Sequence, residues 1–295
     1  MRKRGALTKA HRYTIGQRIA KTFSTKNRIF LCGDAAHTHS SGAAQGLNTG
    51  IHDAVNLAWK LALRIRGLVG DEVLETYTTE RMTAVQKLIN YDRDIATLMS
   101  HKWPSWYKGD PDADPYIVLG EIFENAASFN TGLGISYPSN VLNQASAVDL
   151  HVLPGSRPPD LELSTPGTNQ RVRLQRITRN VAKFQVIVFT GNVSTTKPML
   201  LGLETYLRSA KKLEGSRIVE WTTISPAVGC SPYEAIGMTP FGNTYYDPTN
   251  TAHEKFGVDM QTGGIVVLRP DGLLGSAGPI DGAWVQDYVS KIVQL

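Results

Sequence analysis

The chain has 295 residues, of which 41% are hydrophobic and 19% are charged, and its formal net charge is +5 at pH 7. These proportions are typical of a globular protein, and the length allows two domains of about 150 residues. The basic residues are scattered and form no stripe interleaved with aromatics, which argues against a nucleic-acid-binding protein. The sequence shows no apolar run near the ~18 residues of a membrane span and no apolar segment typical of a secretory signal.

The two cysteines, Cys32 and Cys230, lie far apart in the sequence. This arrangement is neither a disulfide framework nor a zinc-binding pattern. Free thiols are typical of reducing compartments, so we expect a cytoplasmic protein. Cys230 is not part of a Cys-x-x-Cys pair, which argues against dithiol exchange.

The first part of the chain is predicted to hold one short strand and two long helices. The apolar run 28–32 ends at Gly33 and predicts a buried strand. The first helix has apolar residues spaced three and four apart, a pattern that predicts a core-facing side. Those residues are Ile51, Ala54, Val55, Ala58, Leu61, Ala62 and Ile65. A second helix is expected from about Asp71, ending at the latest at Pro104. The apolar residues of the second helix are Val73, Leu74, Tyr77, Val85, Leu88, Ile89, Ile95 and Leu98.

The second part alternates strands and helices. Residues 104–160 are rich in Pro, Gly, Asp and Asn and include a helix-like piece at 117–129, and the cluster 153–159 breaks regular structure. We therefore predict two domains, 1–154 and 155–295. The elements predicted in the second domain are strands at 184–189 and 218–224, a helix at 196–212, a hairpin at 264–274 and a helix at 284–293. This order suggests a small α/β layer domain.

One stretch carries the chemistry. Asp34 follows the predicted strand, where α/β folds bind ligands, and a carboxylate there can accept bonds from hydroxyl groups. A loop of small residues, 40–50, then leads into a helix, whose free N–H groups bind anions and electron-rich oxygens. The local sequence thus predicts a polyol beside Asp34 and a negatively polarised group at the helix start.

Three motifs in this stretch resemble the flavin-binding region of group A flavoprotein monooxygenases, more narrowly the phenol 2-monooxygenase (phenol hydroxylase) family. The motifs are Gly33-Asp34-Ala-Ala-His37, then Gln45-Gly46-Leu47-Asn48, then Asp53 with Asn56-Leu57-x-Trp59-Lys60-Leu61. The resemblance is strongest over 13–93, and it continues more weakly beyond 155. Its other motifs are Tyr13-x-x-Gly16-Gln17-Arg18, Tyr77-x-x-Glu80-Arg81, Gly155-x-Arg157-x-Pro159 and Arg269-Pro-Asp-Gly272.

The resemblance implies an α/β protein made of two parts. The first is an incomplete FAD-binding domain of the glutathione-reductase-like Rossmann type, lacking its N-terminal βαβ unit, and the second is a thioredoxin-like dimerisation domain. By the same resemblance, Asp34 binds the FAD ribityl chain, backbone N–H groups of 46–48 face the flavin N1–C2=O edge, and residues 41 and 42 line the flavin face. The implied cofactor-binding residues are Gly33, Asp34, Ser41, Gly42, Ala44, Gln45, Gly46, Leu47 and Asn48.

The sequence departs from the family at two loop positions and in its extent. Ser41 stands where the family has Pro, and Ala44 where it has Gly. The Cβ of Ala44 is expected to crowd the flavin or to disfavour a positive φ. No G-x-G-x-x-G motif for the ADP pyrophosphate occurs, so we expect the first half of such an enzyme to be missing and apolar surface to be exposed.

Two functions remain open on this basis. The first is an FAD-dependent monooxygenase that hydroxylates a phenolic substrate with NAD(P)H and O2, as a homodimer or as a dimer with a full-length relative. The second is a non-catalytic dimerisation protein derived from such an enzyme. No catalytic base can be named. His37 and His39 could be a metal pair, but two ligands without a third favour a role in loop packing or in lining a ligand. Trp59 is expected to be a core residue.

Overall fold

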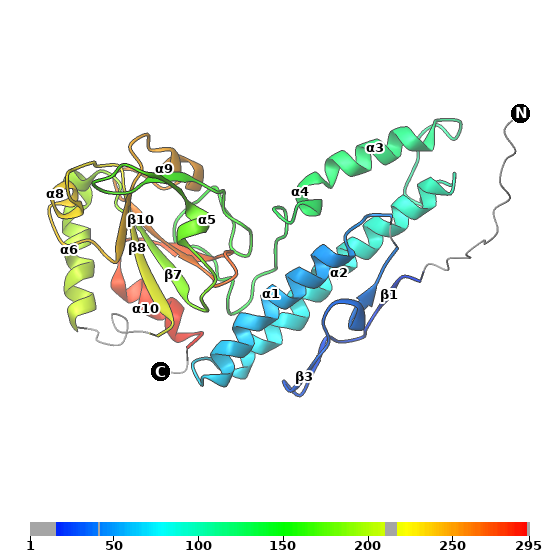
Figure 1. The fold of residues 1–295 in the computed structure, drawn as a ribbon, viewed down its shortest axis with the longest axis horizontal. Coiled ribbons are helices and arrows are strands. Elements are labelled where there is room, and N and C mark those ends of the chain that lie inside the picture. The colour runs from blue at the N-terminus through cyan, green and yellow to red at the C-terminus, as the bar shows by residue number, and fades with distance from the viewer. Residues whose placement is uncertain (1–15, 41, 210–216, 294–295) are drawn as a thin grey trace, which may run out of the picture.

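The computed structural model describes residues 16–40, 42–209 and 217–293. Two long helices that lie side by side, α1 (Gly46–Ile65) and α2 (Asp71–Met99), dominate the first part (Figure 1). Short strands pair beside them as antiparallel couples, β1 with β4 and β2 with β3. The smaller elements are β1 (Arg18–Ile19), β2 (Ser24–Thr25), β3 (Ile29–Phe30), η1 (Gly33–Ala35), β4 (His37–Thr38), α3 (Pro115–Asn125) and α4 (Ala127–Asn130).

The predicted buried strand at 28–32 is wrong in extent and in burial. Strand β3 covers two residues, and Ile29 is 62% exposed. In the structure β3 is one arm of a two-stranded hairpin with β2, so one of its faces stays open.

The predicted core face of α1 is also wrong. Ile51, Val55 and Ile65 are exposed, and the side that packs inward is largely polar. The buried residues of α1 are Thr49, Asp53, Asn56, Leu57, Trp59, Lys60 and Leu63. Of the predicted face, Leu61 is half-buried and packs against the core cluster of Leu57 and Tyr77, while Ile51, Val55 and Ile65 lie outward.

Helix α2 follows its prediction. All eight apolar residues expected to face a core are buried, Val73 and Leu98 at its two ends among them. The helix begins at the predicted Asp71, although the N-cap is Gly70, and it ends at Met99, before Pro104. None of the helices in the described residues is long and apolar enough to cross a membrane.

The second part is built on a seven-stranded sheet with the order β11-β10-β7-β8-β9-β5-β6. Strands β7, β8 and β9 are parallel to one another, and β10 and β11 form an antiparallel hairpin beside β7. Its strands are β5 (Glu162–Ser164), β6 (Arg171–Arg173), β7 (Phe184–Phe189), β8 (Val219–Ser225), β9 (Asn243–Tyr246), β10 (Gly264–Leu268) and β11 (Leu274–Gly278). Its helices are α5 (Leu174–Ile177), α6 (Val193–Ser209), α8 (Pro232–Ile236), α9 (Thr251–Phe256) and α10 (Gly282–Ser290).

The predicted elements of this part are confirmed within a few residues. Strand β7 has the predicted bounds 184–189, and all six of its residues are buried. The hairpin at 264–274 is β10 and β11, joined by a turn in which Gly272 has a φ of +78°. Helix α6 ends at Ser209, and the last predicted residues, 210–212, lie outside the described residues.

The segment between the two parts lies along the edge strand β11. The N–H of Gln144 donates to the carbonyl of Gly275 at 2.9 Å, and the N–H of Ala147 donates to that of Ala277 at 2.7 Å. The N–H of Gly155 donates to the Leu274 carbonyl at 2.7 Å. These bonds cover a sheet edge that would otherwise leave its polar groups unpaired.

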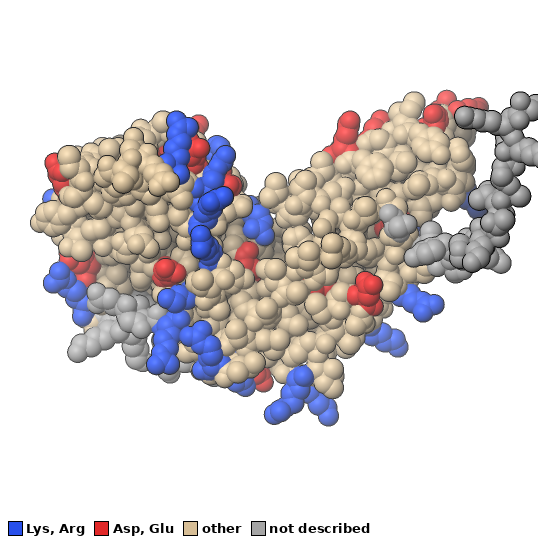
Figure 2. Space-filling view, viewed as in Figure 1, with Lys and Arg blue, Asp and Glu red and all other residues tan. Residues whose placement is uncertain are grey.

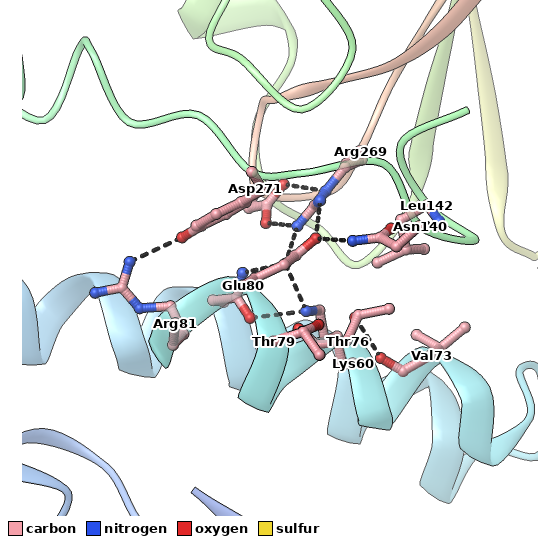
Figure 3. A network of polar contacts seen from close by, with 12 residues as sticks. Lys60, Val73, Thr76, Thr79, Glu80, Arg81, Asn140, Leu142, Arg269 and Asp271 are labelled. Atoms are coloured by element: carbon pink, nitrogen blue, oxygen red, sulfur yellow. Dashed lines mark hydrogen bonds and ion pairs between the residues drawn. The ribbon is translucent and has the colours of Figure 1, made fainter. Parts of the chain in front are cut away.

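A buried cluster of charges joins α1 and α2 to the β10–β11 turn (Figure 3). Glu80 accepts two bonds from Arg269, at 2.6 and 3.0 Å, and one from Lys60 at 2.8 Å. Arg269 also donates to Asp271, and its guanidinium lies 5.8 Å from the centre of the Trp59 ring. All of these charges are buried, so each one depends on its partners.

The pKa values in this cluster follow from burial and pairing. Burial lowers the pKa of Lys60 to about 8, against the opposing effect of Glu80. Burial alone would raise the pKa of Glu80, but Arg269 and Lys60 outweigh it and hold that pKa far below its usual range. Glu80 therefore stays ionised and pairs with both Lys60 and Arg269.

We expect Arg269→Ala to destabilise the chain by about 3–5 kcal/mol, because it leaves Glu80 and Asp271 buried with too little positive charge. Arg64→Ala is the matched control, since it removes an exposed pair with Asp71 and should cost less than about 1 kcal/mol. Denaturant unfolding of both variants measures the difference. Equal losses in the two variants would contradict the prediction.

Acid should weaken the same cluster. The pKa of Glu80 is lower in the folded chain than its usual 4.5, so its contribution to stability is complete above that pH and is lost as the pH falls further. Unfolding curves from pH 7 to pH 3 should therefore show a steeper loss in the wild type than in Glu80→Gln. Parallel curves would show that Glu80 does not carry this pH dependence.

Candidate functional site

The Gly33–Asp34 turn lies against the first turns of α1. Gly33 has a φ of +58°, and a methyl group built on it would lie 3.8 Å from the Cα of Gly50. This close approach of two glycines places η1 directly on the helix start. The turn that carries Asp34 therefore contacts α1 at Gly50, in the second turn of the helix.

The start of α1 offers free hydrogen-bond donors. Gln45 occupies the N-cap position, and its side chain makes no capping bond. In an α-helix the N–H groups of the first residues have no partner within the helix. In α1 these are the N–H groups of residues 46–48. The ring of His39 packs on this end, since a methyl group at Gly46 would lie 3.2 Å from its Cε1.

The predicted site residues form an open surface. Asp34, Ala44 and Asn48 are exposed, and Leu47 is 78% exposed. The outward apolar face of α1 continues this surface from Leu47 to Ile65, and Figure 2 shows a wide uncharged area over the helical part of the visible face. The Lys and Arg side chains on that face lie singly or in small groups.

A buried carboxylate under this surface holds the Gly33 turn. Asp53 Oδ2 accepts the backbone N–H of Gly33 at 2.9 Å and bonds to Nε2 of His37 at 2.8 Å. Its Oδ1 accepts from Nε of Arg81 at 2.6 Å. Burial alone would raise the pKa of Asp53, but the bond to His37 and the charge of Arg81 outweigh it and lower that pKa. The carboxylate therefore remains charged.

Arg81 connects this site with the rest of the molecule. Its guanidinium donates to the hydroxyl of Tyr137 at 2.8 Å, and the Tyr137 ring lies 5.6 Å from the guanidinium carbon of Arg269. The two buried clusters are therefore in contact through one aromatic ring.

A second buried carboxylate holds the other end of the loop. Asp92 on α2 accepts the N–H of Ser40 at 2.6 Å and the side-chain amide of Gln17 at 2.7 Å. The Ser40 hydroxyl donates to the same carboxylate and accepts the N–H of Gly42 at 3.0 Å. Ser41, one of the predicted site residues, lies outside the described residues.

Ala44 keeps a glycine-like backbone. Its φ is +51°, in the left-handed region, although it carries a Cβ. A Cβ disfavours a positive φ, so Ala44 is strained in this conformation. The loop retains the course that a glycine would give it.

Sequence reasoning missed the polar residues beneath the site. Asp53, Asn56 and Lys60 repeat at spacings of three and four, which marks a helix face as clearly as the apolar residues do. This polar stripe distinguishes one side of α1, but it does not indicate that this side is buried. His37 is explained by its bond to Asp53, and no group of three metal-ligating side chains is found in the described part of the chain.

Comparisons with known proteins identify two families that the chain matches. Residues 3–92 match the family described as FAD binding domain, and residues 230–294 match the phenol hydroxylase C-terminal dimerisation domain. The chain is a homologue of FAD-dependent aromatic monooxygenases. It is 30% identical to an FAD-dependent monooxygenase of Aspergillus terreus, an alignment that covers 96% of this chain and 49% of that protein.

Other relatives show the same extent. A 3-hydroxybenzoate 4-monooxygenase of Comamonas testosteroni is 28% identical over 96% of this chain and 50% of its own length. Among solved structures, a ternary complex of aklavinone-11 hydroxylase with FAD and aklavinone aligns with a TM-score of 0.63 at 19% identity, over 95% of this chain and 46% of that one. The chain thus spans about half the length of the curated relatives it matches.

Replacing the strained residue should stabilise the loop. We expect Ala44→Gly to raise the free energy of unfolding by about 1 kcal/mol, because glycine adopts a positive φ without the steric cost that Ala44 bears. Ala58→Gly, on the exposed face within α1, is the control and should lower it by about 0.5–1 kcal/mol. Chemical denaturation of both variants gives the two signs, and a loss of stability in Ala44→Gly would refute the argument.

Proposed function

We propose that this chain forms part of the FAD site of an aromatic monooxygenase that hydroxylates a phenolic ring with NAD(P)H and O2. The observation that carries the proposal is the exposed carboxylate of Asp34 in a turn that contacts α1, whose start has no side-chain cap. A carboxylate suits the hydroxyl groups of a ribityl chain, and helix N–H groups suit an electron-rich ring edge. The match of residues 3–92 to an FAD-binding domain supports the same assignment.

Each residue then has a definite task. Asp34 accepts hydrogen bonds from the sugar-alcohol part of FAD, and the N–H groups of 46–48 face the edge that gains charge on reduction. Gly33, Gly42, Ala44 and Gln45 shape the backbone around it. The flavin itself, when bound, supplies the oxygen chemistry, and the protein supplies position and electrostatics.

We further propose the architecture that the family resemblance implies. Residues 1–154 form an incomplete Rossmann-type FAD-binding domain, which is consistent with the outward apolar face of α1. Residues 155–295 form a thioredoxin-like domain, supported by the order of β7, α6 and β8 followed by a hairpin and α10. The boundary stays a prediction, and we also propose a cytoplasmic location.

A second candidate is a non-catalytic dimerisation protein. The match of residues 230–294 to a dimerisation domain favours it, since that match does not depend on the flavin site. In this case the chain pairs with a second copy or with a full-length relative. Both functions predict a dimer, but only the first predicts bound flavin.

Titration of the purified chain with FAD separates the two candidates. We expect a flavin absorption spectrum on the protein, and Asp34→Ala should weaken binding about 10- to 100-fold, because it removes charge-assisted bonds. Asp287→Ala, which removes an exposed carboxylate paired with Lys291, is the control and should bind like the wild type. A colourless dimer in analytical ultracentrifugation would support the second candidate.

A further inference from the structure

The loop that carries Asp34 runs from residue 33 to residue 46, between β3 and α1. We propose that Asp53 and Asp92 are positioning residues that fix this loop from below, at Gly33 and at Ser40. The inference rests on the proposed flavin site and extends it to two buried carboxylates that do not contact the flavin surface themselves.

The first anchor acts directly before Asp34. The peptide N–H that Asp53 accepts belongs to Gly33, so the bond sets the orientation of the next residue. Asp53 is fully buried and is itself held by His37 and Arg81. A shift of this carboxylate would therefore move the turn that presents Asp34.

The second anchor acts at the approach to α1. Asp92 accepts both the N–H and the hydroxyl of Ser40, and the Ser40 oxygen in turn accepts the N–H of Gly42. Asp92 is fully buried on a different helix from Asp53. Two carboxylates from two helices thus hold the loop at Gly33 and at Ser40.

A charged acceptor is needed at both places. Both oxygens of each carboxylate accept hydrogen bonds, so an amide of the same shape would present an NH2 group to at least one donor. Asp→Asn therefore changes the bonds to the loop with little change in volume. The rest of the core should remain packed.

The chain offers a matched control in its second part. Asp247 is also buried, and it accepts two backbone N–H groups, from Ala252 and His253, as well as the imidazole of His253. All three bonds go to Oδ2, so an Asn can still accept them, and Asp247→Asn removes a buried negative charge at the start of α9 and not in the loop. It should lower stability without altering the flavin site.

The experiment compares Asp53→Asn, Asp92→Asn and Asp247→Asn in the full chain. Hydrogen exchange of the Gly33 and Ser40 amides is measured without FAD, and the FAD dissociation constant is measured by titration. We expect the amide held by the replaced carboxylate to exchange about 10- to 100-fold faster, and FAD to bind about tenfold more weakly or worse, in the two loop variants. Asp247→Asn should leave both quantities at the wild-type value.

Each outcome decides the proposal. Unchanged exchange in both loop variants overturns it, and so does faster exchange with an unchanged FAD dissociation constant. A similar loss of FAD affinity in Asp247→Asn also overturns it, since general destabilisation would then explain the effect. If the wild type itself binds no FAD, the proposed function fails, and exchange alone decides whether the carboxylates hold the loop. Should one loop variant not fold, the other still provides the test.

Discussion

The burial of Glu80 between Lys60 and Arg269 is the interaction on which the arrangement of the chain depends. Its two oxygens accept six hydrogen bonds, from Asn56, Lys60, Asn140, Asn143 and twice from Arg269. Cations brought out of water need such a partner, since an unpaired buried charge is strongly destabilising. Because Glu80 lies on α2 and its partners come from α1, from the connecting segment and from the β10–β11 turn, the two parts of the chain are held in one relation to each other.

This constraint also decides which way α1 faces. Helix α1 packs against α2 with a polar stripe that lies beside Leu57, while most of its apolar stripe is exposed. Glu80 and Arg81 on α2 offer charged partners to Lys60 and Asp53, so the polar stripe lies inward. The apolar stripe is then left on the surface, next to the loop that carries Asp34.

The sequence could predict elements whose burial follows from their own pattern. The core residues of α2 and the strand 184–189 are of this kind, because periodicity or a continuous apolar run identifies them locally. The inner side of α1 could not be predicted in this way. Its burial depends on Arg269, which lies more than two hundred residues further along the chain, and no local pattern contains that information.

The candidate site shows the same division. Motifs identified its surface, from Gly33 to Asn48, since backbone donors and an exposed carboxylate follow from local structure. Asp92 and the link from Arg81 to Tyr137 became visible only in three dimensions. These contacts also give a role to the motif residues that lie below the surface. Asp53 and Arg81 bind each other beneath the loop, and the ring of Tyr137 lies between this pair and the Glu80 cluster. One continuous layer of buried polar side chains therefore both positions the loop and joins the two parts of the chain.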